Sequence, residues 1–126
     1  MQENKALILR VTEELLGKRN LAIIDEVAAP TFVNHHPGSG QDRDGLKAFL
    51  AALFAVVPVL EYTIEHVVAE GDLVALHLRG RGTQVGELFG APPTGQPFAN
   101  ESITINRIAE GKIVERWYVA SAFQKT

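Results

Sequence analysis

The chain contains no cysteine among its 126 residues. This absence excludes a disulfide framework, a thiolate nucleophile and every metal site with cysteine ligands. Three common motifs are missing too, namely the dinucleotide-binding G-x-G-x-x-G, the Walker phosphate loop and the G-x-S-x-G nucleophile elbow. Any chemistry of this protein must therefore use other side chains in other arrangements.

Long apolar runs and a surplus of positive charge are lacking as well. No segment approaches the ~20 apolar residues of a membrane-spanning helix, and the polar N-terminus does not resemble a signal peptide. A formal net charge of −3 and the lack of a basic stripe argue against nucleic acid as a partner. We therefore expect a cytoplasmic protein that binds neither nucleic acid nor a membrane, with residues 1–126 forming one domain.

The first half of the chain has helical periodicity. Apolar residues recur at four-residue spacing, and Pro30 and Pro58 end the second and third periodic segments. Asp44 is a candidate N-cap for the third segment. The predicted helices are residues 3–17, 21–29 and 44–57.

The second half has the alternation of strands. Gly71-Asp72 and Glu110-Gly111 are predicted two-residue hairpin turns. Residues 86–95 are too rich in glycine and proline for a strand interior, so we expect a long ordered loop. Helices followed by antiparallel strands indicate an α+β domain, with helices on one sheet face and a pocket beneath them. The predicted strands are residues 60–69, 73–84, 96–108 and 112–123.

Counting outward from the second turn predicts a candidate binding face. Thr104 then lies opposite Trp117, and Asn100 lies opposite Ser121. An apolar wall that carries a few polar groups is what a small-molecule pocket needs. The alternative is a half-solvated outer face whose polar side chains contact water.

The histidines supply further candidates. His35 titrates near neutrality and could transfer protons, while the neighbouring Asn34 could donate to a carbonyl or enolate oxygen. The alternative for His35 is a structural hydrogen bond that fixes the loop against a helix. His66 and His77 face each other across the first predicted hairpin and could form half of a zinc site, which needs three or four ligands. No other ligands can be identified, so cross-strand partners on a solvated face are favoured.

Several strings, in their order and spacing, resemble the SnoaL-like polyketide cyclases of the nuclear transport factor 2-like superfamily. They cover most of the chain from about residue 30 onward. The strings are Phe32-Val-Asn-His-His-Pro37, Asp44-Gly-Leu-Lys-Ala-Phe-Leu50, Ala69-Glu-Gly-Asp72, Gly82-Thr-Gln-Val-Gly-Glu87, Gly90-Ala-Pro-Pro-Thr-Gly95 and Gly111-Lys-Ile-Val-Glu-Arg-Trp117.

The resemblance implies a cone-shaped fold, in which three N-terminal helices pack on a curved, mainly antiparallel sheet and enclose a pocket. It implies a small apolar or polycyclic ligand, no cofactor and no metal, and a homodimer formed through the outer sheet face. Asn34 and His35 would lie at the pocket mouth. Cyclases of this family close a ring by intramolecular aldol condensation, with an acidic side chain as the general acid/base.

Two positions depart from the family pattern. The cyclase acid is expected four residues after the tryptophan, where this chain has Ser121, and many relatives have histidine at the position of Gln84. A serine can orient a substrate but needs a partner to act as a base. We therefore hold two hypotheses: a cofactor-free cyclase or isomerase acting on an apolar, oxygenated, polyketide-like compound, or a non-catalytic ligand-binding or dimerisation module. The candidate catalytic residue is His35, and the candidate substrate-binding residues are Asn34, Gln84, Asn100, Thr104, Trp117 and Ser121.

Overall fold

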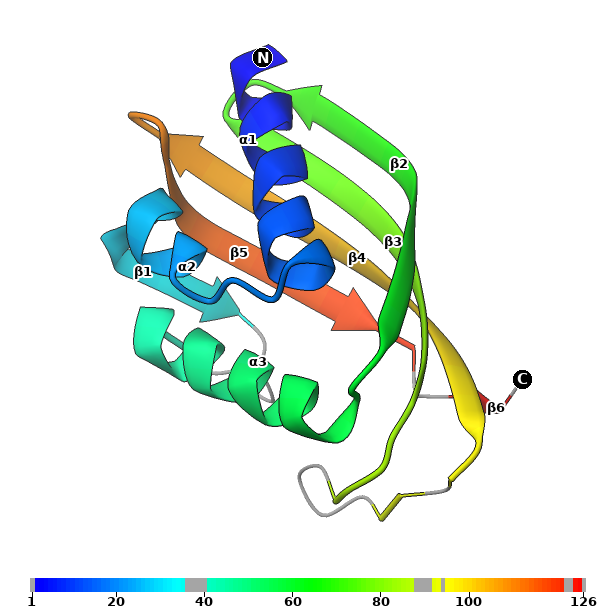
Figure 1. The fold of residues 1–126 in the computed structure, drawn as a ribbon. Coiled ribbons are helices and arrows are strands. Elements are labelled where there is room, and N and C mark those ends of the chain that lie inside the picture. The colour runs from blue at the N-terminus through cyan, green and yellow to red at the C-terminus, as the bar shows by residue number, and fades with distance from the viewer. Residues whose placement is uncertain (1, 36–40, 88–91, 94, 122–123, 126) are drawn as a thin grey trace.

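Helices cover one face of a curved sheet whose strands run diagonally beneath them (Figure 1). The structure is a computed structural model that describes residues 2–35, 41–87, 92–93, 95–121 and 124–125. Parts of the predicted loop at 86–95, and residues 122–123 of the last predicted strand, lie outside the described residues.

The three predicted helical segments are confirmed, with changed bounds. Helix α1 (Gln2–Thr12) continues into a π-helical turn, η1 (Glu13–Gly17), and is followed by α2 (Ile23–Val27) and α3 (Arg43–Val56). The predicted N-cap of α3, Asp44, is wrong. Asp42 is the cap, because its Oδ1 accepts the backbone N–H of Gly45 at 2.8 Å. No helix in the described part of the chain is long and apolar enough to cross a membrane.

The strands form one sheet. Its strands are β1 (Ala28–His35), β2 (Leu60–Glu70), β3 (Leu73–Thr83), β4 (Pro97–Ala109), β5 (Lys112–Ala120) and β6 (Gln124–Lys125). They lie in the order β1-β5-β4-β3-β2, with β6 beside β4. β1 pairs with β5 in parallel, whereas the other described pairs are antiparallel.

Strand β1 corrects the sequence prediction, which continued the second helix to residue 29 and placed no long strand before residue 60. The helix ends at Val27, and an extended chain begins at Ala28. Proline is tolerated at Pro30 because β1 is an edge strand, where a missing N–H costs no ladder hydrogen bond. This strand brings Asn34 beside Arg116 of β5.

Both predicted hairpin turns are confirmed. Glu110 and Gly111 have positive φ values of 53° and 74°, as a type I′ turn requires, and Gly71 has a φ of 60°. The predicted pairing of His66 with His77 is confirmed as well.

The predicted register of the second hairpin is wrong by one residue. Ile108 pairs with Ile113, but Arg107 pairs with Glu115, so Val114 has no counterpart on β4. This bulge moves every later side chain of β5 to the opposite face. Thr104 therefore lies opposite Tyr118 and not opposite Trp117. The backbone N–H of Ser121 donates to the carbonyl of Glu101, so Ser121 is not opposite Asn100 either.

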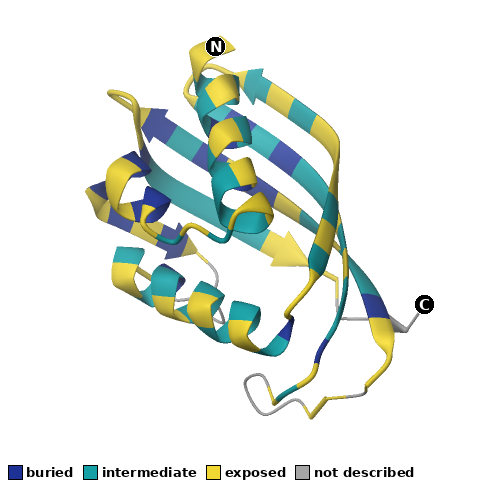
Figure 2. Ribbon diagram, in the orientation of Figure 1, coloured by how far each residue is buried: buried dark blue, intermediate teal, exposed yellow. Residues whose placement is uncertain are grey.

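An apolar core joins the helices to the end of the sheet where β4 turns into β5. Figure 2 shows buried residues on the strands that lie beneath the helices. The buried cluster consists of Ile8, Ile23, Ile24, Val27, Ala28, Phe32, Leu46, Val74, Leu76, Ile108 and Ile113. This core fixes one end of the cone and leaves the other end for a cavity.

The corrected N-cap of α3 can be tested by stability measurements. Asp42→Ala is expected to lower the free energy of unfolding by about 1 kcal/mol, because it removes the hydrogen bond to Gly45. Asp44→Ala is the matched control and should cost only about 0.3 kcal/mol, through the helix dipole and an exposed pair with Lys47. Urea denaturation measures both values. An equal or larger loss for Asp44→Ala would contradict the assignment.

Candidate functional site

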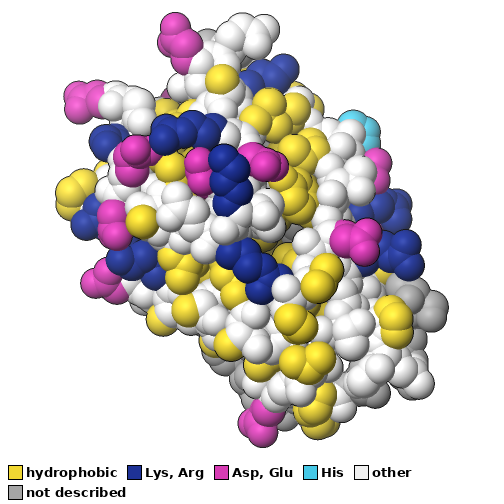
Figure 3. Space-filling model, viewed as in Figure 1, with side chains coloured by type: hydrophobic (Ala, Val, Ile, Leu, Met, Phe, Trp, Pro, Cys, Tyr) yellow, Lys and Arg dark blue, Asp and Glu magenta, His cyan; other side chains and the backbone are white. Residues whose placement is uncertain are grey.

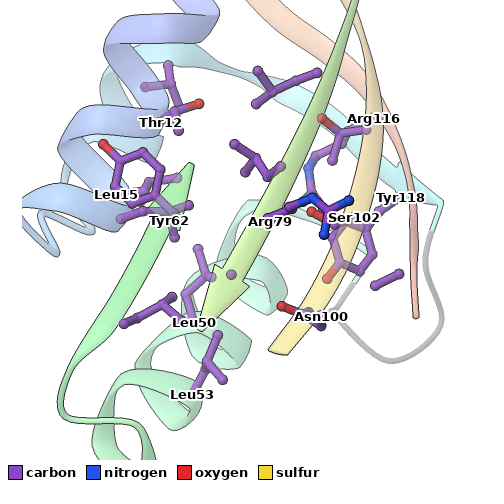
Figure 4. Close-up of a pocket in the computed structure, with 18 of the residues that line it drawn as sticks. Thr12, Leu15, Leu50, Leu53, Tyr62, Arg79, Asn100, Ser102, Arg116 and Tyr118 are labelled. Carbon is purple, nitrogen blue, oxygen red and sulfur yellow. The ribbon is translucent and has the colours of Figure 1, made fainter. Parts of the chain in front are cut away.

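A cavity of about 560 Å³ lies between the helices and the concave face of the sheet. Apolar side chains of α1, η1 and α3 form its upper wall, and Figure 4 shows Leu50 and Leu53 facing the sheet across it. Hydrophobic side chains are also visible along the junction of the helices with the sheet (Figure 3). A mostly apolar cavity of this size suits a drug-sized organic ligand.

The sheet side of the cavity carries a polar stripe. Asn100, Ser102, Thr104 and Asn106 alternate along β4, so their side chains share one face. Thr104 and Asn106 are buried, and the Asn106 amide donates to the Thr104 hydroxyl over 3.4 Å. The cavity thus combines an apolar wall with hydrogen-bonding groups on its floor.

Arg116 of β5 lines the same side of the cavity, close to Ser102 and Tyr118 (Figure 4). Its Nη1 donates to Asn34 Oδ1 at 2.9 Å, and its guanidinium carbon lies 4.8 Å from the centre of the Tyr118 ring. No carboxylate in the described part of the chain forms an ion pair with it. Burial lowers the pKa of Arg116 to about 10, which leaves the side chain charged at neutral pH.

Two tyrosines of the lining keep their protons at neutral pH. Burial raises the pKa of Tyr118, against the opposing effect of the Arg116 charge. The hydroxyl of Tyr62 donates to Glu13 Oε2 at 2.6 Å, and this hydrogen bond, followed by burial and the negative charge, raises the pKa of Tyr62 to about 12. Both are therefore hydrogen-bond donors or neutral relays, not bases.

Glu13 is held beside the cavity by η1. A Cβ added to Gly17 would lie 2.9 Å from the Glu13 carboxyl carbon, so a side chain at that position would displace this carboxylate from where it now lies. Glu13 itself does not line the cavity, whereas its hydrogen-bond partner Tyr62 does.

The structure gathers three of the predicted binding residues at the cavity: Asn100, Thr104 and Ser121 all line it. The Ser121 hydroxyl is already engaged, because it accepts the backbone N–H of Glu101 at 2.9 Å. Gln84 is buried away from the lining and donates to the carbonyl of Gly86.

Trp117, His35 and Asn34 are not among the lining residues. The bulge at Val114 puts Trp117 on the outer face, where its ring stacks on His35 at 5.1 Å. His35 Nε2 lies 2.7 Å from Glu115 Oε2. Asn34 is only 1% exposed, and its side chain accepts a hydrogen bond from Arg116, which lines the cavity. No ligand tests the roles predicted for these residues.

Sequence reasoning missed Arg116, Tyr118, Asn106 and Tyr62. The regular alternation of β4 could have placed Asn106 with Thr104. Arg116 and Tyr118 could be found only with the bulge in β5, because without it they point outward.

The histidine pair lies on the outer face, as cross-strand partners. His66 Nδ1 is 3.0 Å from His77 Nδ1, and His77 Nε2 is 2.9 Å from Glu101 Oε1. Within the described residues, no group of three or more His, Asp or Glu side chains could hold a metal ion.

Comparison with known proteins identifies the family. The family model of the SnoaL-like polyketide cyclases matches residues 6–123. The chain therefore belongs to the SnoaL-like polyketide cyclase family, as its motifs predict. No curated protein matches the sequence significantly.

Solved structures confirm the predicted fold. IdmH from Streptomyces antibioticus, a proposed polyketide cyclase, is 31% identical with a TM-score of 0.78, and the match covers 93% of this chain and 91% of that one. A proposed SnoaL-like polyketide cyclase from Jannaschia sp. CCS1 is 30% identical, with a TM-score of 0.84 and coverages of 95% and 86%. AclR from Streptomyces galilaeus, a proposed hydroxylase, is 27% identical, with a TM-score of 0.85 and coverages of 96% and 90%.

Because Asn34 is buried, we predict that its side chain contributes substantially to the stability of the folded protein. Asn34→Ala should lower the free energy of unfolding by roughly 1–3 kcal/mol, because Arg116 loses its hydrogen-bond acceptor inside the protein. The neighbouring variant His35→Ala serves as the control and should cost under about 1 kcal/mol, because its side chain is 41% exposed. Chemical denaturation compares the two. A larger loss of stability in His35→Ala than in Asn34→Ala would contradict the structural role assigned to Asn34.

Proposed function

We propose that this protein binds an apolar, oxygenated ring compound of the polyketide type and acts on it as a cofactor-free cyclase or isomerase. The observation that carries the proposal is the cavity of about 560 Å³, with its apolar wall and polar floor. Membership of the SnoaL-like family and the likeness to proposed polyketide cyclases support it. The likeness to a proposed hydroxylase means that the fold alone does not select the reaction.

Such a reaction needs a group that removes a proton from carbon. No carboxylate or histidine of the described residues lines the cavity directly. The sequence predicts His35 for this role, but its position on the outer face argues against contact with a ligand in the cavity. We assign the role to Tyr62 and Glu13: the Tyr62 hydroxyl takes up the carbon-bound proton while it passes its own proton to the Glu13 carboxylate.

A binding module without catalysis is the second candidate function. It is favoured by Ser121, which replaces the expected family acid and whose hydroxyl is already bonded to the Glu101 amide. In that case the cavity would hold a ligand without exchanging its protons.

Hydrogen–deuterium exchange separates the candidates. NMR in D₂O would follow exchange of the α-protons of 2-tetralone, an enolisable bicyclic ketone, in the presence of the protein. We expect acceleration by the wild type, a loss of roughly 10²–10⁴-fold in Glu13→Gln, a comparable loss in Tyr62→Phe, and no change in His35→Ala.

Two other outcomes of the exchange experiment would change the proposal. If the wild type binds the ketone without accelerating exchange, the protein is a binding module. If His35→Ala abolishes exchange and Glu13→Gln does not, the base is His35.

We also propose that two copies of the chain associate through the outer sheet face. Exposed apolar side chains of that face include Val33, Ile103, Ile105 and Val119, the last at 66%. They belong to the adjacent strands β1, β5 and β4, so they form one region next to Trp117. A contiguous exposed apolar region of this kind is typical of an interaction surface.

Light scattering coupled to gel filtration tests the association. The wild type should have the mass of a dimer, and Ile105→Asp should have the mass of a monomer, because a buried unpaired carboxylate opposes association. Val59→Asp replaces an equally apolar, 67% exposed residue away from this face and should remain dimeric. A monomeric wild type would exclude the proposed dimer.

A further inference from the structure

The cavity holds a half-buried cation, Arg116, that has no anionic partner among the described residues. Burying an unpaired charge is costly, and proteins pair such charges where they can. The partners of Arg116 are neutral: the Asn34 carbonyl oxygen and the Tyr118 ring. Ser102, Thr104 and Asn106, which line the cavity with it, add neutral hydroxyl and amide groups.

A second arginine on the same strand pair provides a comparison. Arg107 of β4 lies on the outer face, also over an aromatic ring, with its guanidinium carbon 5.5 Å from the centre of Trp117. It forms ion pairs with Asp72 at 3.7 Å and Glu115 at 3.6 Å. Arg107 thus has two carboxylate partners, and Arg79, which also lines the cavity, pairs with Glu65 and Glu101, whereas Arg116 has no carboxylate partner among the described residues.

The orientation of Arg116 suits a ligand. Asn34 engages one nitrogen, Nη1, and the Tyr118 ring supports the guanidinium plane from one side. A guanidinium has five donors in a planar fork, so further donors can serve a group in the cavity. The fork matches two oxygen atoms that share one negative charge, a geometry that a lysine does not reproduce.

We propose that the cavity selects ligands that carry a delocalised oxyanion, either a carboxylate or the enolate of a 1,3-dicarbonyl, on an otherwise apolar ring system. Arg116 binds the oxyanion, and the apolar side chains of α1 and α3 contact the rings. Asn34 is a positioning residue that holds the guanidinium without neutralising it. This inference rests on the proposed function, since it requires that the cavity binds a ring compound.

Two probe pairs test the selectivity by isothermal titration calorimetry at neutral pH. One pair is 2-naphthoate and the neutral 2-naphthamide, and the other is the 1,3-indandione enolate and the neutral 1-indanone. For the wild type we expect the anion of at least one pair to bind roughly 10-fold to 100-fold more tightly than its neutral partner, as charge-assisted hydrogen bonds imply. The probe pair in which the anion binds more tightly shows whether the site prefers a carboxylate or an enolate.

Four variants locate the effect. Arg116→Met should abolish the preference and still bind the neutral probe. Asn34→Asp is nearly isosteric and places a carboxylate beside Nη1, so it should abolish the preference while Arg116 and the cavity shape remain. Arg116→Lys keeps the charge, loses the fork and should retain only part of the preference. Arg107→Met is the matched control on the outer face and should leave the preference unchanged.

The results separate this inference from the proposed function. Wild-type protein that binds the neutral probes without preferring either anion would overturn the oxyanion site alone. Binding of none of the four probes would overturn the proposed function as well. A preference that survives in both Arg116→Met and Asn34→Asp would place the anion elsewhere.

Discussion

One extra residue in β5, Val114, decides which side chains the cavity receives. Ile113 faces the core, and a regular strand would then point Glu115, Trp117 and Val119 inward as well. Because Val114 has no counterpart on β4, the alternation changes there, and Arg116 and Tyr118 face the cavity. The same bulge places Trp117 and Val119 on the outer face. The cavity lining and the exposed apolar region of the outer face therefore both depend on it.

The two faces of this strand pair also differ in how charge is balanced. On the outer face, Arg107 and His35 each have a carboxylate partner, and Glu115 serves both. In the cavity, the partners of Arg116 among the described residues are neutral, and the most buried of them is Asn34. A carboxylate in place of Asn34 would satisfy the cation within the protein. Its absence leaves charge available to a ligand at a cost in folding free energy, a compromise that is usual at functional sites.

Local patterns predicted most of the fold and little of the site. The hairpin turns, the helical segments and the pairing of His66 with His77 depend on residues close in sequence. β1 was missed because Pro30 predicts a helix end as readily as an edge strand. The bulge was missed because Ile113 and Val114 are both apolar, so the sequence does not show which of them is the extra residue. Asn100 and Thr104 were placed correctly, because β4 alternates without interruption, whereas the faces of Trp117 and Arg116 depend on the bulge.

The charge of Arg116 reconciles the proposed proton transfer with Ser121, which stands where the resemblance predicts an acid. Tyr62 has a pKa of about 12, so the proposed relay of a proton to Glu13 requires another group to stabilise the charge that develops on the ligand. A cation in a low-dielectric cavity lowers the pKa of a bound enolisable compound, because it stabilises the oxyanion more than the neutral form. A weaker base then suffices. On this argument Arg116 would supply by electrostatics part of what a carboxylate at position 121 would supply by basicity, and the proposed site therefore requires a ligand that ionises easily.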